Sequence, residues 1–481
     1  MRTLLICKAA SLLMALAMSG PLHAQSDGTT VAAPARPSTQ TGVVAGQDAL
    51  ELYIQQGIDS NLVMQQKNVS LDKALLALRR ARSLYAPTIA FQTLYQTGDG
   101  GRDIPLPLGD LLNGAYATLN QLTNSNAFPQ LENQSINFFP RNFYDAKVRT
   151  TIPIYDKDLA YNKQISGQQV QLQEFEVAAY RRELVKEIKL AYYDHLRALQ
   201  AVAIQRSALG LAGEGKRVNQ KLLDNGKGLP AYLLRAESEI AAVEAQLTQA
   251  AQQVDNARLY FNMLLNRPAT AAIDTSFNEE SALHSIPMLP NGPASAQQRE
   301  ELQSLAAYIR LNETVLKMNK QFFLPKLGGF LDLGSQAEGF RFNKQSRYYL
   351  TGLQLDIPIF SGQRNKMTIT ETNLNLRNAQ LNLQQVSQQL NLSAQVATNN
   401  LTAAWKTYQS TTVQLNAAET YQRLIDRGYQ AGTNTYIETV DARNQLTTAR
   451  LAATINKYNV LQAAAVLERE TAAYSFPTKN Q

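Results

Sequence analysis

Residue types that catalyse reactions or bind metals are scarce in this chain. It contains one cysteine, Cys7, and three histidines, His23, His195 and His284. One cysteine excludes a disulfide framework and a cysteine-based metal cluster, and so few histidines argue against a histidine-rich metal site. His195 lies within a helical pattern without a partner motif, so we interpret it as a packed or surface residue. The composition therefore predicts neither a metal nor a cofactor.

The remaining motifs that could carry chemistry are weak. The segment "GLAGEG" at 210–215 is rich in glycine, but it follows a long helical pattern, whereas a phosphate-binding loop follows a strand. We interpret it as a loosened turn of that helix. Glu183, Glu187 and Asp194 are interpreted as a solvated helix face, and no nucleophile–base arrangement is readable. We therefore predict that the protein is not an enzyme.

Residues 1–24 have the features of a secretory signal peptide. Arg2 and Lys8 precede the apolar stretch "AASLLMALAMSG", and the small Ala24 stands at the expected cleavage site. Cys7 precedes the apolar stretch, so it cannot be a lipoprotein cysteine. Removing the signal lowers the formal net charge of +7 to +5, an excess too small to favour nucleic-acid binding. Residues 25–46 are rich in Ala, Pro, Thr and Gly and are predicted to be disordered.

The rest of the chain consists of two repeats, 47–266 and 299–473. In each repeat a helix ends at a proline that starts a strand, a second strand leads into a long helix, and that helix breaks at a glycine. The second proline and the glycine are 73 residues apart in the first repeat and 74 in the second. The matched positions are Pro87 with Pro325, Pro153 with Pro358, and Gly226 with Gly432. Such self-similarity is typical of a duplicated architecture.

Three segments lie outside this repeated pattern. Residues 98–142 have no counterpart in the second repeat, and their apolar side chains predict that they fold, with a short helix; if the strands belong to a barrel, this helix would cap its mouth. Residues 267–298 contain prolines and serines and form a linker. Residues 474–481 form a C-terminal tail.

The strands alternate between apolar and polar residues. Apolar positions share one face, and polar positions share the other; the apolar set is Tyr144, Ala146, Val148, Thr150, Ile152 and Ile154, then Tyr349, Thr351, Leu353, Leu355 and Ile357. No stretch of 18 apolar residues follows the signal, so a membrane protein of this sequence would have to span through strands of about ten residues. A soluble sheet with one wet face is the alternative. Four strands cannot close a membrane barrel, so a barrel would have to be shared among subunits.

The helical stretches are far longer than a globular core needs. Residues 158–225 and 363–431 contain no proline, and each predicts a helix about 100 Å long. Helices over 231–266 and 436–471 return after the glycine turns. The fold class is therefore mainly α, with long helical hairpins and four strands. A solvated coiled-coil rod is the alternative.

Together these features resemble the TolC family of outer-membrane channels, over about residues 47–473. The most specific piece is "RGYQAGTNTYIETVDARNQL", which resembles the turn of the family's second hairpin. The helix-to-strand junctions "ARSLYAPTI" and "FLPKL" and the strand-to-helix junctions "IPIY" and "IPIFSG" also resemble family features, and they occur along the chain in the family's order. The resemblance implies a homotrimer with a twelve-stranded β-barrel in the outer-membrane lipid and an α-helical tunnel in the periplasm. It also implies that a periplasmic adaptor and an inner-membrane pump open the tunnel.

The resemblance also indicates a gate at the glycine turns, Gly226 and Gly432. Glu438 and Asp441 match the family's acidic constriction and would form two rings of three carboxylates that favour cations. Tyr429 matches a tyrosine that latches the closed state, whereas Asn434 stands where an arginine is expected. Arg235 is suggested as an ion-pair partner of Asp441. Glu438 and Asp441 would otherwise be ordinary acids near a helix dipole.

The implied function is that of an exit duct of a tripartite efflux or type I secretion system in a Gram-negative cell. A periplasmic adaptor or structural spacer is the alternative. An adaptor would contain a lipoyl-like hairpin with Gly and Lys and a mostly β second half, and the sequence has neither.

Overall fold

The computed structural model describes residues 49–137, 139, 141–286 and 296–476. The predicted signal peptide (1–24), the predicted disordered segment (25–46), part of the linker and the end of the tail lie outside the described residues. In the described part of the chain, no helix is long and apolar enough to cross a membrane.

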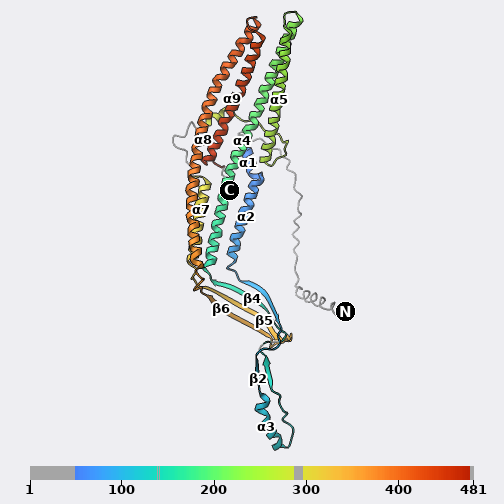
Figure 1. Ribbon diagram of the computed structural model, residues 1–481, viewed down its shortest axis with the longest axis vertical. Coiled ribbons are helices and arrows are strands. Elements are labelled where there is room, and N and C mark those ends of the chain that lie inside the picture. Colours follow the sequence, from blue (N-terminus) through green and yellow to red (C-terminus); the bar gives the residue numbers. More distant parts are fainter. Residues whose placement is uncertain (1–48, 138, 140, 287–295, 477–481) are drawn as a thin grey trace, which may run out of the picture. The chain divides into compact units, whose positions relative to one another are not determined.

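Long helices dominate both repeats (Figure 1). The helices of the first repeat are α1 (Ala49–Ser60), α2 (Leu62–Ser83), α3 (Leu108–Thr123), α4 (Lys157–Asp224) and α5 (Pro230–Leu264). The linker contributes α6 (Glu279–Ser285), and the second repeat contributes α7 (Glu300–Lys320), α8 (Arg364–Gln430) and α9 (Tyr436–Glu470). The predicted long and returning helices are confirmed to within one or two residues at each end. Helix α4 runs unbroken through residues 210–215, so the predicted loosening there is wrong.

The helix predicted from residue 47 to Pro87 is divided into α1 and α2 at Asn61. Asn61 has an extended backbone conformation, and its side-chain oxygen accepts a hydrogen bond from the backbone N–H of Met64 at 3.0 Å. Its side-chain amide donates to the backbone oxygen of Leu264 at 2.8 Å, and the Ser60 hydroxyl donates to that of Leu265. The break therefore satisfies carbonyl groups at the end of α5.

Four strands form one antiparallel sheet in the order β1-β4-β5-β6. Their bounds are β1 (Thr88–Gln96), β4 (Phe143–Tyr155), β5 (Lys326–Glu338) and β6 (Arg347–Asp356). The register aligns Phe91, Val148, Leu333 and Tyr349 in one row across the sheet. Because alternate residues point to opposite faces, the predicted apolar faces of both repeats lie on the same side. Phe91 and Tyr349 are 71% and 76% exposed on that side.

The opposite face of the sheet carries paired charges. Arg149 on β4 lies beside Asp332 on β5 and donates two hydrogen bonds of 2.7 Å to its carboxylate. Tyr348 donates to Asp145 at 2.7 Å, and Lys147 pairs with the same carboxylate at 2.9 Å. The predicted division into an apolar and a polar face is therefore confirmed.

The segment between β1 and β4 folds, as predicted. The short strands β2 (Asp103–Leu106) and β3 (Gln134–Asn137) pair with each other, and α3 lies between them in the chain. Asn113 and Asn120 anchor α3 by hydrogen bonds to the backbone of Leu131 and Phe128. That this helix caps a pore mouth stays a prediction.

The two repeats share one hydrophobic core. Helix α4 packs against α2, α5, α7 and α9, and α8 packs against α9 (Figure 1). The largest fully buried side chains of the core come from α1, α4, α5 and α9 and include Ile54, Ile188, Tyr192, Phe261 and Tyr458. The linker helix α6 is held here, because Glu279 accepts hydrogen bonds from Gln200, Lys457 and Tyr458.

A charged network lies where α4, α7 and α9 meet. Arg469 is 6% exposed and pairs with Glu183 at 3.0 Å and with Glu301 at 2.5 Å. Arg299 pairs with Glu301 at 2.8 Å and also with Glu470. Despite its burial, Glu301 has its pKa lowered to about 2 by the hydrogen bonds from Arg299 and Arg469. The network fixes the second repeat to the first repeat at residues far apart in the sequence.

We expect Ile188→Ala to lower the free energy of unfolding by about 2–5 kcal/mol, because a fully buried methyl-rich side chain is lost and a cavity remains. The measurement is denaturant unfolding followed by circular dichroism at 222 nm. The control is Ile455→Ala, which changes a 44% exposed residue and should shift stability by no more than about 0.5 kcal/mol. Equal losses in the two variants would contradict the placement of this core.

Candidate functional site

The predicted gate residues lie at the turns of the two hairpins. Helix α4 ends at Asp224 and α5 begins at Pro230, while α8 ends at Gln430 and α9 begins at Tyr436. Gly226 and Gly432 have φ values of +71° and +78°, which glycine adopts without strain. Hydrogen bonds from Gly432 N to Tyr429 O and from Thr433 N to Gly428 O then close the end of α8.

Glu438 completes a capping box at the start of α9. The Thr435 hydroxyl accepts from the backbone N–H of Glu438 at 3.3 Å, and the Glu438 carboxylate accepts from that of Thr435 at 2.6 Å. The Asn434 side chain donates to the same carboxylate at 3.2 Å. These bonds, that from Thr435 first, lower the pKa of Glu438. Glu438 therefore has the structural role in the first turn of α9 that the sequence offers as the alternative to a gate. Its carboxylate nevertheless remains exposed.

Asp441 is also exposed and lies three residues further along α9, on the same side of the helix. Its carboxylate accepts a hydrogen bond from the Gln445 side chain at 2.7 Å. Within the described part of this chain, Asp441 and Arg235 form no ion pair, so the suggested contact is absent. Arg235 instead lines a groove of about 390 Å³ with Glu239, Val440 and Asn444.

Tyrosine side chains join the two hairpins beside these carboxylates. The ring of Tyr436 is 1% exposed, and its centroid lies 5.7 Å from that of Tyr232 and 6.2 Å from that of Tyr429. Ala236 and Val440 complete this cluster. The Tyr429 hydroxyl lies 3.5 Å from the side-chain oxygen of Asn219 on α4, at the outer limit of a hydrogen bond.

Glu239 on α5 is a site residue that sequence reasoning missed. Its carboxylate accepts from the Tyr436 hydroxyl at 3.4 Å, so it faces the tyrosine cluster from the other hairpin. Burial raises the pKa of Glu239, although the nearby charge of Arg443 opposes this shift. Its apolar neighbours Ile240 and Val243 do not distinguish Glu239 from the other acids of α5. The sequence therefore could not predict that Glu239 is half-buried.

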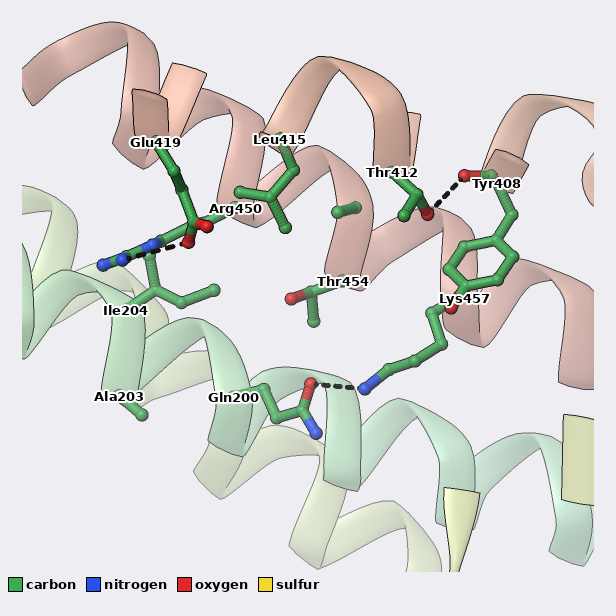
Figure 2. A pocket seen from close by; sticks show the side chains of 11 residues that line it. Gln200, Ala203, Ile204, Tyr408, Thr412, Leu415, Glu419, Arg450, Thr454 and Lys457 are labelled. Atoms are coloured by element: carbon green, nitrogen blue, oxygen red, sulfur yellow. Dashed lines mark hydrogen bonds and ion pairs between the residues drawn. The ribbon is translucent and has the colours of Figure 1, made fainter. Parts of the chain in front are cut away.

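A second groove, of about 410 Å³, lies between α4, α8 and α9 (Figure 2). Its charged side chains are already paired within the chain. Arg450 lies 3.3 Å from Glu419, and Lys457 pairs with Glu279 while it donates to Gln200. This groove therefore offers no unpaired charge to a ligand. Among the described residues, no cluster of three His, Cys, Asp or Glu side chains could hold a metal ion.

Comparison with known proteins yields a consistent group of relatives. The model of the family described as "Outer membrane efflux protein" matches residues 293–472, which include the second hairpin and its turn. The alkaline protease secretion protein AprF of Pseudomonas aeruginosa is 23% identical over 337 residues, which cover 66% of this chain and 68% of that protein. The resemblance found in the sequence is therefore confirmed.

Solved structures share the fold over most of the chain. The CmeC outer membrane channel of Campylobacter jejuni has a TM-score of 0.69 at 14% identity, covering 88% of this chain and 85% of that one. The open state of the MtrE outer membrane channel of Neisseria gonorrhoeae has a TM-score of 0.68 at 14% identity, with 88% and 89% covered. Such likeness confirms the arrangement of long hairpins and strands.

We expect Glu239→Gln to stabilise the protein increasingly as the pH rises. The raised pKa means that the folded state favours the protonated form of Glu239, so wild-type stability is full below pH about 4.5 and falls as the pH passes the folded-state pKa. Glutamine stays neutral and keeps an acceptor for Tyr436. The difference in unfolding free energy should grow over that window and then level off.

The control is Glu237→Gln, which removes a carboxylate that pairs with Lys216 at the surface. A stability difference for Glu239→Gln that stayed constant with pH would show that burial does not penalise this carboxylate.

Proposed function

We propose that this relative of the outer-membrane efflux proteins is a trimeric outer-membrane channel that exports small molecules or peptides without chemistry of its own. The observation that carries the proposal is the combination of two long helical hairpins with a four-stranded sheet that exposes one apolar face. This arrangement matches solved outer-membrane channels over 88% of the chain. A soluble protein has no reason to expose Phe91, Tyr349 and Leu353 at 71–76%.

The free edges of the sheet support a trimer. Strands β1 and β6 are the edges of the four-stranded sheet, and each has pairing partners on one side within the chain. Unpaired backbone groups are too costly in lipid, so these edges must pair with other subunits. Three copies would give twelve strands, with the apolar row outside and the Arg149–Asp332 pairs inside.

The helical hairpins would form the periplasmic tunnel, and their turns would meet a periplasmic adaptor and an inner-membrane pump. The relative AprF is by its name a secretion protein, whereas the family is described as efflux proteins. Both roles need the same duct, because the pump selects the cargo. The proposed place of the described segment 98–137 is the cell surface, since long loops of outer-membrane barrels lie outside.

The proposed gate consists of Glu438 and Asp441. Both carboxylates are exposed at the end of the second hairpin, so three copies around an axis would form two acidic rings that favour cations. The capping box holds the Glu438 carboxylate in one position, because Thr435 and Asn434 both donate to it. An orienting contact of this kind suits a charge that must stay at the rim of a pore.

A periplasmic spacer without a pore is disfavoured by the sheet. A spacer needs the hairpins but has no use for strands with an apolar outer face and paired charges on the inner one. An adaptor is disfavoured by the second repeat, which is mainly helical through α7, α8 and α9.

The test is single-channel recording in planar bilayers with wild type and Glu438→Gln/Asp441→Asn. We expect a small cation-selective conductance in wild type, and a larger one with a permeability ratio near one in the variant. The variant removes both charges, yet glutamine can keep the capping box.

Thr435→Ala is the matched control, because it weakens the cap by about 0.5–2 kcal/mol and keeps both charges. It should therefore retain cation selectivity. Wild-type selectivity in the double variant would place the gate elsewhere, and no conductance from well-folded protein would refute the duct.

A further inference from the structure

Arg443 on α9 reaches across to the first hairpin. Its Nη1 donates a hydrogen bond of 3.1 Å to the backbone oxygen of Leu211 on α4. The guanidinium occupies a notch at Gly215, where a Cβ atom would lie only 2.6 Å from Nη1 and 3.1 Å from the Tyr436 hydroxyl. A Cβ atom at residue 215 would therefore force the end of the Arg443 side chain to move from this position.

The same guanidinium also faces the other two helices of the hairpins. Its Nη2 lies 3.9 Å from the carboxylate of Asp426 on α8, and its charge acts on Glu239 of α5. The Arg443 side chain is only 13% exposed. All four helices of the two hairpins therefore converge on one cation.

The contacts that the sequence suggested for a latch are weaker in this chain. The Tyr429 hydroxyl lies 3.5 Å from Asn219, and Asn434 bonds to Glu438 within its own hairpin. A charge-assisted hydrogen bond such as that from Arg443 to Leu211 is about twice as strong as a neutral one. The hydrogen bond from Arg443 to Leu211, at 3.1 Å, is also shorter than the bond from Tyr436 to Glu239, at 3.4 Å, which joins the same two hairpins.

We infer that Arg443, seated in the Gly215 notch, is the residue that positions the second hairpin against the first and holds the tip of the duct closed. The inference deepens the proposed function and rests on it. A backbone carbonyl can accept a second hydrogen bond through its free lone pair, so Leu211 can bind the arginine without leaving the helical ladder. Lysine lacks the planar fork and cannot reach Leu211 and Asp426 together.

Two variants test this inference from opposite sides of the contact. Arg443→Ala removes the cation, whereas Gly215→Ala fills the notch and favours the helix of α4. We expect either variant to raise the ratio of open to closed times in planar bilayers about tenfold, which corresponds to the loss of one charge-assisted hydrogen bond. Arg443→Lys should lie between Arg443→Ala and wild type.

The matched control is Arg450→Ala, one heptad further along α9. Arg450 also pairs with an acid on α8, Glu419 at 3.3 Å, but this contact stays within the second hairpin. The control should gate like wild type. If Arg443→Ala and Gly215→Ala also gate like wild type, the inference is overturned and the duct stands.

Hydrogen–deuterium exchange separates the inference from the proposed function. Arg443→Ala should speed exchange several-fold at 436–446 and 208–219, and Arg450→Ala should not. A wild type that never conducts would refute the duct, while faster exchange confined to Arg443→Ala would still support the contact. Unchanged exchange in Arg443→Ala would overturn the positioning role whatever the conductance.

Discussion

The two repeats are held together through α4 and β4, because α4 packs against α7 and α9 while β4 pairs with β5. Near the middle of α4 and α9, Ile188 and Tyr192 share a core with Tyr458 and Leu461, and each buried side chain contributes about 1.5–3 kcal/mol. Toward the turns the two hairpins meet through the tyrosine cluster around Tyr436 and through a few polar contacts. Each of these polar contacts is worth about 0.5–3 kcal/mol. The large core around Ile188 and Tyr458 therefore joins the repeats far from the turns, and the smaller cluster around Tyr436 joins them beside the turns.

At the turn of the second hairpin, the structural role of Glu438 is compatible with its proposed role in the gate. The Glu438 carboxylate accepts a hydrogen bond from the backbone N–H of Thr435 at the start of α9. The same bond holds the charge of Glu438 in a defined position. A structural acid and a pore-lining acid need not be alternatives, because the cap uses one side of the carboxylate and leaves the side chain exposed. Asp441 has no such cap, since it lies one turn further into the helix.

Most of the fold could be predicted because prolines, glycines and period-two alternation are local signals. Pro87, Gly226 and Gly432 predict the ends of their helices to within a few residues. The break at Asn61 was missed because Asn61 is held by a hydrogen bond to the end of α5, which is distant in the sequence. The residues of the candidate site show the same difference between local and distant signals. The turn and its acids are readable along one helix, whereas Arg443 and Glu239 contact residues of other helices. Counting from the glycines suggested an ion pair of Arg235 with Asp441, but Arg235 lines a groove with Glu239 instead.

The segment between β1 and β4 leaves and re-enters the sheet at neighbouring positions, because Gln96 pairs with Phe143. The ends of an insertion at this point are held together by the sheet whatever its length. Each doubling of its length costs only about 0.6 kcal/mol of closure entropy. An insertion at this point can therefore become longer or shorter without disturbing the strand register.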